Sequence, residues 1–526
     1  MQIRRLSIIK KKCLVDFNIR FHTMEGRSTT ILIGENGTGK STMMESILEI
    51  LMSFDSPSIE KQMDYDYIFE YEYAQKNISI TKFGHDYRFC VDGDTFEGSY
   101  ASVRRRISSQ RLFPKRVIAF YSGANNKLEP AIKKMNVQYR KQYLRTMAGA
   151  FVDMANDTTT EIPATPIKKF NFCDEHLVPI YLCAILDGHN SCEKQYFVKE
   201  CKFTEIDRVS MMINLDKVEH FFGIDKFEGE WPNNLFFTTD YVEHQFTDIL
   251  RRGWKFAADG KGYFELNGIR ELDLNSRDIL EFFEVLHDLF DAKYETYVKA
   301  DNEAVSTYDM SEGQRQLIKV LGMLGICKRE DCLILMDEPD AHMNPKWKYG
   351  LKNIMDQCLE EATNAQAIIA THDPLVINGV PKEFIRIFAY NETVRDNSGR
   401  PVTRVIEPVE DTAGMGIDGL LQSEYYGLYT TLDTKTQEKL EEKRNLMVKR
   451  KEGTITEDEM LQLLRLTDEL EQMDFSRNIP TDNYFDDFVV AMHEAYQGRP
   501  RAALTQEEIA ERNQRAREIA ERLIDQ

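Results

Sequence analysis

The chain has 526 residues, of which 42% are hydrophobic and 11% aromatic, and it carries a formal net charge of −20. This length predicts a soluble globular protein of two to four domains. No window approaches 18 uncharged apolar residues, and the apolar stretch from Leu6 to Ile9 is far too short for a signal peptide, so we expect no membrane partner. The acidic balance argues against a broad surface that coats nucleic acid, since non-specific DNA binding needs basic area.

The first 52 residues predict three short strands and a helix. The strands are expected at Ile3–Ile9, Leu14–Phe21 and Thr29–Ile33, and the helix at Ser41–Met52. Between the third strand and the helix lies Gly34-Glu35-Asn36-Gly37-Thr38-Gly39-Lys40-Ser41, which fits G-x4-G-K-[ST]. A strand before this loop and a helix after it are the context that makes the motif specific.

The chemistry of this glycine loop predicts ATP and Mg²⁺ as ligands. Its backbone N–H groups would face the β-phosphate, and the helix N-terminus adds a favourable dipole. Lys40 would place its charge between the β- and γ-phosphates, and Ser41 would offer its hydroxyl to Mg²⁺.

Residues 65–120 alternate aromatic and polar side chains, which predicts β-structure that ends in the apolar run Val117–Tyr121. Two basic strips belong to this part of the chain. Each can serve as a local track for nucleic-acid phosphates or as an ordinary solvated surface, and the sequence favours neither. The strips are Arg104, Arg105, Arg106, Arg111, Lys115 and Arg116, and Lys133–Lys134 through Arg145.

Residues 125–300 carry no motif that we can name. Helical patterns at Leu177–Leu186 and Ile279–Phe290 and a hairpin pattern at Trp254–Leu266 predict an inserted helical and mixed subdomain. Cysteines and histidines cluster here, and zinc needs four such ligands. The pairs mix residue types and flank apolar sequence, so buried thiols and ordinary histidines are the favoured interpretation and zinc the alternative. The cluster consists of Cys173, His176, Cys183, His189 and Cys192. All nine cysteines have scattered spacings, which indicates free thiols in a reducing, cytoplasmic compartment.

Residues 310–374 contain three further segments in which polar residues stand at the start or the end of an apolar helix or strand. Met310-Ser311-Glu312-Gly313-Gln314 precedes an apolar helix, with Ser311 as N-cap and Gly313 allowing close backbone approach. The apolar strand Cys332–Met336 ends in Asp337 and Glu338, and Ile368–Thr371 ends at His372. Asp337 can hold the Mg²⁺ water shell, Glu338 can polarise the attacking water, and His372 can reach the γ-phosphate side.

Beyond residue 410 the chain becomes charged. Residues 411–430 have the composition of a linker, and the remainder is expected to be helical, with capping boxes at Thr456–Glu459 and Thr505–Glu508. The last helix offers Ile509, Ile519 and Leu523 near one face. It can pack on its own protein or dock a partner or another dimer.

In this order the motifs resemble the ABC-type nucleotide-binding domain, in the SMC/RecF/OLD-like branch. The resemblance rests on the glycine loop, Asp337-Glu-Pro-Asp-Ala-His-Met-Asn-Pro345 and Thr371-His-Asp-Pro-Leu-Val-Ile377. It implies an α/β fold with an ATPase lobe at 1–125, an inserted subdomain at 126–300, a second ATPase lobe at 301–410 and a helical region at 411–526.

The resemblance also implies a role for each site residue and a homodimer that closes around two nucleotides, with higher oligomers possible. Lys40, Glu338 and His372 would be catalytic, and Ser41 and Asp337 would bind Mg²⁺. ATP would be bound by Gly34, Glu35, Asn36, Gly37, Thr38, Gly39, Lys40, Ser41 and Thr42, and, from the second copy, by Ser311, Gly313 and Gln314. Two departures stand out. Glu312 replaces the usual glycine of the signature, and Ser122-Gly123 stand where a Q-loop glutamine is expected.

The overall plan also resembles bacterial anti-phage ATPases of the Septu and retron-associated type, which work beside a separately encoded nuclease. The features that carry this resemblance are Val117–Gly123, Thr371-His-Asp-Pro374 and the charged helical end after Ser423–Leu428. It implies an ATPase that regulates a partner effector, since no HNH or Toprim pattern follows residue 380. A repair ATPase that clamps DNA directly and an ATP-binding scaffold with slow turnover are the alternatives.

Overall fold

The computed structural model describes most of the chain, in two compact units. Unit 1 comprises 1–377 and 383–405, and unit 2 comprises 378–382 and 406–526. The described residues are 1–22, 29–114, 116–122, 132, 170–173, 175–186, 191–222, 255–256, 260–266, 283, 286–287, 290–300, 303–327, 331–360, 365–396, 399–428, 430–451, 453–473, 514–516 and 518–519.

The centre of unit 1 is a seven-stranded sheet in the order β18-β17-β3-β16-β15-β8-β9. The neighbouring strands from β17 to β9 are parallel to each other. Their apolar runs are continuous because a parallel sheet is covered on both faces. The strands are β3 (Thr29–Gly34), β8 (Arg116–Tyr121), β9 (Phe170–Phe172), β15 (Cys332–Asp337), β16 (Gln366–Ala370), β17 (Ile385–Arg395) and β18 (Pro401–Ile406).

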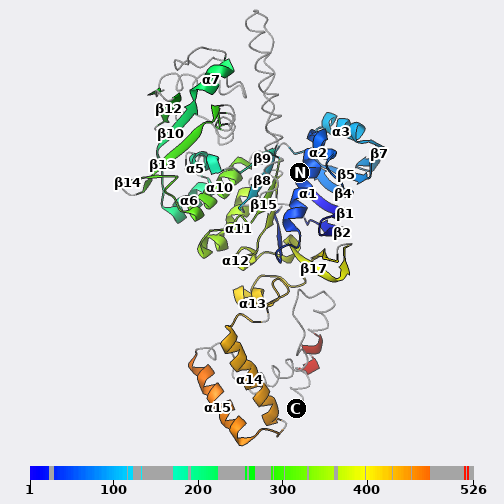
Figure 1. Ribbon diagram of the computed structural model, residues 1–526, viewed down its shortest axis with the longest axis vertical. Helices are drawn as coiled ribbons and strands as arrows, with labels where there is room; N and C mark the ends of the chain where they lie inside the picture. Colours follow the sequence, from blue (N-terminus) through cyan, green and yellow to red (C-terminus); the bar gives the residue numbers. More distant parts are fainter. Residues whose placement is uncertain are drawn as a thin grey trace, which may run out of the picture. The chain divides into compact units, whose positions relative to one another are not determined.

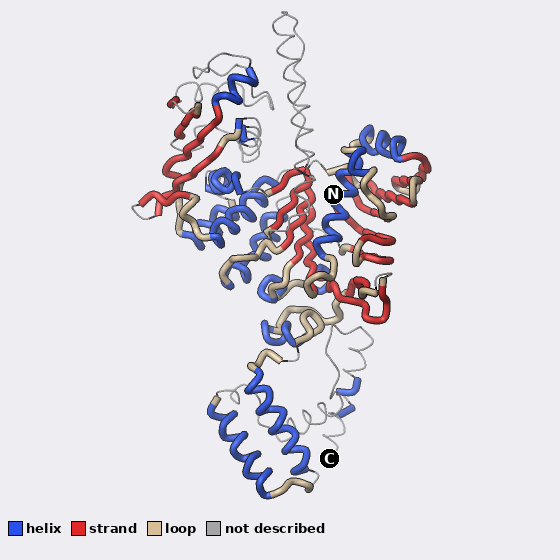
Figure 2. Tube along the Cα trace, viewed as in Figure 1, coloured by secondary structure: helices blue, strands red, loops and turns tan. Residues whose placement is uncertain are grey.

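Successive residues of the central strands point into two different hydrophobic cores. On β15, Leu333 and Leu335 pack with helix α1 (Lys40–Asp55), whereas Ile334 and Met336 pack on the opposite face. Strands β8 and β16 divide their residues in the same way. Because side chains alternate along a strand, the residue that follows Leu335 by two, Asp337, belongs to the face of α1. Figures 1 and 2 show helices on both sides of this sheet.

The α1 face is also covered by a six-stranded antiparallel sheet in the order β2-β1-β4-β5-β6-β7. Its β1 and β2 form a hairpin whose turn lies near α1, as the contacts below show. The elements are β1 (Gln2–Lys11), β2 (Leu14–Arg20), α2 (Pro57–Glu60), β4 (Tyr67–Tyr73), β5 (Lys76–Phe83), β6 (Asp86–Val91), β7 (Asp94–Ser99) and α3 (Tyr100–Ser109).

The opposite face carries helices from two distant parts of the sequence. Helix α5 packs on α10, and α6 packs on both α10 and α11. The helices are α5 (Val178–Leu186), which follows the 3-10 turn η1 (Glu175–Leu177), α6 (Cys192–Cys201), α10 (Glu312–Cys327), α11 (Pro345–Glu360) and α12 (Pro374–Ile377), followed by the turn η3 (Lys382–Phe384).

A third sheet has the order β11-β12-β10-β13-β14, and all its described pairs are antiparallel. Its β13–β14 hairpin crosses the boundary predicted at residue 300, and β9 joins the central sheet, so this region shares elements with the ATPase lobes. Its elements are β10 (Ile206–Asn214), α7 (Leu215–Phe222), β11 (Lys255–Phe256), β12 (Lys261–Leu266), β13 (Lys293–Ala300) and β14 (Glu303–Ser306).

Unit 2 contains α13 (Gly416–Gln422) and the helical hairpin of α14 (Thr434–Lys451) and α15 (Glu457–Gln472). The linker expected at 411–430 is wrong. Thr412 is buried and its hydroxyl donates to the Val380 carbonyl at 2.8 Å. The buried Glu424 carboxylate accepts from the Val409 backbone N–H at 2.7 Å. Side-chain bonds to the backbone, together with the burial of Leu420 and Tyr425, therefore fold this segment.

Several sequence predictions are confirmed element by element. The three N-terminal strands, the helix after the glycine loop, the Trp254–Leu266 hairpin and the Thr456–Glu459 capping box are all present. The four-domain division stays a prediction. Most of Ile279–Phe290 lies outside the described residues, as do Thr505, Ile509 and Leu523, so the docking helix also stays a prediction. No described helix is long and apolar enough to cross a membrane.

Candidate functional site

The glycine loop joins β3 to α1, and three of its glycines have backbone angles that L side chains rarely adopt. Gly34, Gly37 and Gly39 have φ values of 134°, 82° and 95°. A Cβ atom on Gly34 would lie 2.0 Å from the Phe388 carbonyl oxygen of β17. Glycine is therefore required at Gly34 both by its backbone angle and by the close approach of the neighbouring strand.

Lys40 and Ser41 begin α1 and already have polar partners. The Lys40 ammonium donates to the carbonyl oxygens of Gly34 and Glu35 at 2.7 and 3.0 Å. The Ser41 hydroxyl donates to the Asp337 carboxylate at 2.6 Å. The two residues predicted to hold Mg²⁺, 296 positions apart in sequence, are thus brought into direct contact. Their oxygens are the donor type that Mg²⁺ prefers, so these residues fit the ion.

Asp337, Glu338 and His372 lie at the carboxyl ends of neighbouring parallel strands. β15 and β16 pair in register up to Asp337 and Ala370, and the Glu338 N–H donates to the Ala370 carbonyl at 2.8 Å. Glu338 has a φ of 52°. His372 Nε2 lies 3.4 Å from the Glu338 carboxylate. The sequence prediction that these strands are neighbours is therefore confirmed.

Burial shifts three pKa values at this site. Desolvation lowers the pKa of Lys40 to about 8, although the acids Asp337 and Glu338 oppose this. Burial raises the pKa of Asp337 to about 6, against the hydrogen bond from Ser41. Burial and the nearby Lys40 charge lower the pKa of His372. A buried cation, a buried acid and a neutral imidazole together form a site that is suited to a charged ligand.

Ser122 stands at the expected Q-loop position and contacts the carboxylate strand through its backbone. Its N–H and its hydroxyl lie 3.3 and 3.4 Å from the Asp337 carbonyl oxygen. Gly123 lies outside the described residues. The serine therefore ties β8 to β15 at the strand ends.

The signature segment is a helix cap. The Gln314 N–H donates to the Ser311 hydroxyl at 3.3 Å, and the Ser311 N–H donates to the Gln314 side-chain oxygen at 2.9 Å. This reciprocal pair is a capping box. A Cβ on Gly313 would lie 2.7 Å from the His342 carbonyl oxygen. The predicted N-cap and the close approach at Gly313 are both confirmed, and the exposed Glu312 faces His342 at 3.4 Å.

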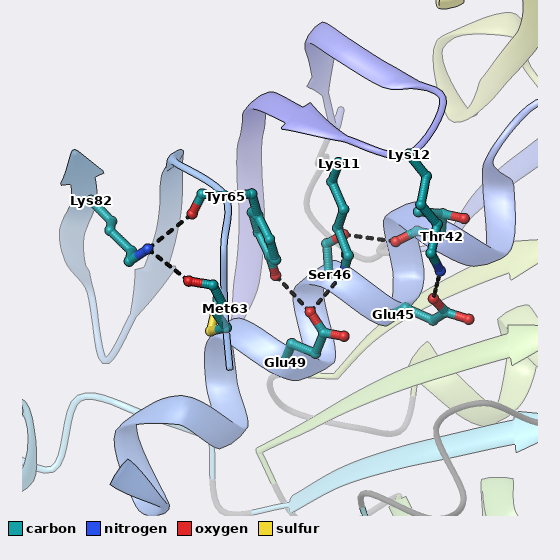
Figure 3. A network of polar contacts seen from close by, with 9 residues as sticks. All are labelled: Lys11, Lys12, Thr42, Glu45, Ser46, Glu49, Met63, Tyr65 and Lys82. Carbon is teal, nitrogen blue, oxygen red and sulfur yellow. Dashed lines mark hydrogen bonds and ion pairs between the residues drawn. The ribbon is translucent and has the colours of Figure 1, made fainter. Parts of the chain in front are cut away.

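Four contacts around the glycine loop had no sequence signal. Thr403 on β18 donates its hydroxyl to the Thr38 carbonyl at 2.7 Å. The Tyr390 hydroxyl on β17 lies 3.4 Å from the Asn36 carbonyl oxygen. From the β1–β2 turn, Lys12 and Lys11 pair with Glu45 and Glu49 on α1, as Figure 3 shows. Each contact depends on a single residue that belongs to no motif, and its partner becomes a neighbour only in the folded chain.

The prediction that the first basic strip forms a continuous surface is wrong. Arg116 is fully buried at the start of β8. Arg104 donates to the backbone carbonyls of Phe54 and Asp55. Arg106 lies over the Phe96 ring at 3.9 Å. Arg116 pairs with Cys332 on the central strand β15, and a charge count cannot reveal this burial. Lys115 and the strip Lys133–Lys134 through Arg145 lie outside the described residues.

The cysteine–histidine cluster is arranged differently from the predicted pairs. Cys173 and Cys183 are buried free thiols. The Cys192 sulfur lies 3.2 Å from that of Cys358 on α11, next to Glu193. His189 lies outside the described residues.

The parallel sheet, the glycine loop at its centre and the acid and histidine residues at its strand ends define a P-loop ATPase fold. Residues 209–378 match the family described as "AAA domain, putative AbiEii toxin, Type IV TA system". The chain is similar to the "Retron Vc95 probable ATPase" of Vibrio cholerae serotype O1 biovar El Tor, with 23% identity over 74% of this chain and 73% of that protein. It is similar to the "Septu protein PtuA" of Bacillus mycoides, with 24% identity over 32% of this chain and 25% of that protein.

Among solved structures, the SMC head bound to the C-winged helix domain of ScpA covers 77% of this chain and 98% of its own length, at 12% identity and a TM-score of 0.34. The matches to the AAA family and to the retron and Septu proteins confirm the resemblance that the motifs indicated. The chain therefore has a P-loop ATPase fold, part of it matches an AAA family, and it is similar to ATPases of the retron and Septu type.

Proposed function

We propose that the chain binds ATP with Mg²⁺, hydrolyses it as a dimer and thereby regulates a separately encoded nuclease or other effector in bacterial anti-phage defence. The observation that carries the ATPase proposal is the 2.6 Å contact between Ser41 and Asp337 beside Glu338. This contact joins the end of the glycine loop to the first of the paired carboxylates, which is 296 positions away in the sequence.

Each residue has a role in this proposal. Gly34 to Thr42 enclose the phosphates, and Lys40 leaves the loop carbonyls to pair with phosphate oxygens. Ser41 and Asp337 hold Mg²⁺, which, when bound, neutralises charge that develops on the phosphates. Glu338 orients the attacking water, and His372 donates toward the γ-phosphate from the next strand.

Replacing Glu338 by Gln tests this assignment. The amide keeps the size of the side chain but cannot take up a proton, so E338Q should bind ATP and hydrolyse it more slowly by a factor of about 100 or greater. K40A is the contrasting variant and should lose ATP binding itself. Turnover at the wild-type rate in E338Q would remove Glu338 from the catalytic role.

The dimer is proposed because the signature helix presents its N-terminus to solvent. Ser311 is exposed and Gln314 is half-buried. The two residues bond each other, and neither has a described hydrogen bond to the glycine loop of its own chain. Ser311, Gly313 and Gln314 would instead meet the nucleotide of the second copy, since a helix N-terminus favours anions.

Mixing two inactive variants tests the dimer. A K40A chain supplies an intact signature, and an S311A chain supplies an intact glycine loop, so a mixed dimer should regain about one working site of two. Mixed dimers verified by mass that stay inactive would contradict the exchange of signatures between copies.

The proposal that the chain controls an effector is supported by its similarity to the Retron Vc95 probable ATPase and to the Septu protein PtuA. Cells that carry the complete locus should resist phage with the wild-type gene and lose resistance with the E338Q variant. A nuclease encoded by a neighbouring gene should copurify with the chain.

A DNA clamp is the second candidate function. The burial of Arg116 and the backbone contacts of Arg104 weigh against it. Tight binding of DNA by the chain alone at physiological salt would favour the clamp.

A further inference from the structure

Tyr121, the last residue of β8, has a buried hydroxyl without a partner. No hydrogen bond to its hydroxyl oxygen exists among the residues that the structure describes, and the atom has almost no accessible surface. Leaving a buried polar group unpaired is unfavourable, because the group loses its hydrogen bonds to water and gains none in return. In native proteins such a group commonly marks the place of a water or an ion.

The alternation of the central strands places this side chain on the face of α1. Val117 and Ala119, which precede it on β8 by four and two residues, pack in the α1 core, and Tyr121 packs against the same core. Tyr121 also pairs in register with Asp337 on the adjacent parallel strand. Neighbouring residues in register share a face of the sheet, so Tyr121 and Asp337 point to the same side.

Two carboxylates act electrostatically on the Tyr121 hydroxyl. Burial raises the pKa of Tyr121, and the charges of Asp337 and Glu45 raise it further. Glu45 follows Ser41 by one turn of α1 and is buried, and its carboxylate is held by Lys12 at 2.9 Å (Figure 3). The Tyr121 side chain therefore lies on the same side of the sheet as the Ser41–Asp337 contact.

We propose that Tyr121 positions a water of the Mg²⁺ hydration shell and thereby takes the place of the missing Q-loop glutamine. The proposal rests on the proposed ATPase function. Mg²⁺ keeps several of its waters when it is bound through one or two protein oxygens. A phenol can accept a hydrogen bond from such a water and donate one to a carboxylate, which would satisfy the buried hydroxyl. Tyr121 is a positioning residue here and does not touch the reacting atoms.

The test is Y121F, measured with Mn²⁺ as the probe metal and a non-hydrolysable ATP analogue as the nucleotide. Phenylalanine keeps the ring and removes only the hydroxyl. Mn²⁺ affinity in the presence of the analogue should fall about three- to tenfold. Affinity for the analogue in EDTA should not change. The Tm without ligand should stay the same or rise by about 1 °C, because an unpaired polar group is removed.

Y71F is the matched control, because the buried Tyr71 hydroxyl has a partner, the Leu112 carbonyl at 3.1 Å. It should lower the Tm and leave Mn²⁺ affinity unchanged. Equal Mn²⁺ affinity in Y121F and wild type overturns the proposal, and so does a Y121F that loses Tm or loses analogue affinity in EDTA. If the wild-type chain itself binds neither the analogue nor Mn²⁺ with it, the proposed ATPase function fails instead.

Discussion

Removing the Thr403 hydroxyl should weaken nucleotide binding from outside the glycine loop. Thr403 donates to the Thr38 carbonyl at 2.7 Å. A trans peptide is planar, so a carbonyl held on one side of the loop directs the N–H of the next residue, Gly39, to the other side. Because this N–H belongs to the set expected to face the β-phosphate, T403V should loosen the phosphate cradle without touching it.

The size of the effect follows from the bond that is lost. A buried carbonyl left without its donor costs about 1–3 kcal/mol. If all of this free energy were lost from binding, the affinity for ATP would fall about five- to 150-fold. The loop is also fastened by the Thr38 hydroxyl, which donates to the Glu35 carbonyl at 2.7 Å, and by Tyr390. We therefore expect the lower end, a loss of about five- to tenfold in ATP affinity.

Calorimetric titration with ATP, ADP and AMP checks this reasoning. T403V should lose affinity for ATP and ADP alike, because both carry a β-phosphate, and should bind AMP as the wild type does. T403S keeps the hydroxyl and should bind all three normally. Wild-type affinity for ADP in T403V, or an equal loss for AMP, would refute the link between this side chain and the loop.

Four further outcomes are expected. G313A would bring a Cβ to 2.7 Å from the His342 carbonyl, so ATPase activity should fall about tenfold or more in a turnover assay while ATP binding to the separate chain is unchanged. The pKa of Asp337 is about 6 and that of Lys40 is about 8. The affinity for ATP in the presence of Mg²⁺, measured by titration, should therefore be highest at a pH between these two values. In the free protein, the stability contributed by Asp337 should decrease as pH rises from 3.8 to about 6, and that contributed by Lys40 should increase from about 8 to 10.5 in urea melts. T456A removes the cap of α15 and should lower the stability of unit 2 by about 1 kcal/mol in the same melts.

The arrangement of the candidate site could be predicted from the sequence because its parts follow local rules. A glycine loop between a strand and a helix, and acids that end apolar strands, are readable in short windows, and parallel strands bring their carboxyl ends together. Thr403 and Tyr121 could not be found in this way. Thr403 meets Thr38 across 365 positions, and no spacing rule connects them. The opposite error arose at Arg116, where a charge suggested surface and the sheet required burial.

The capping box at the start of α10 has a consequence for how a second copy could recognise ATP. Ser311 and Gln314 already form hydrogen bonds with each other. Contact with a phosphate would therefore exchange one acceptor for another, and this exchange gains little in the number of bonds. What remains to favour closure is the negative charge of the phosphate at the positive end of the helix. A helix end of this kind discriminates between nucleotides by their charge, so a triphosphate would close the pair more firmly than a diphosphate.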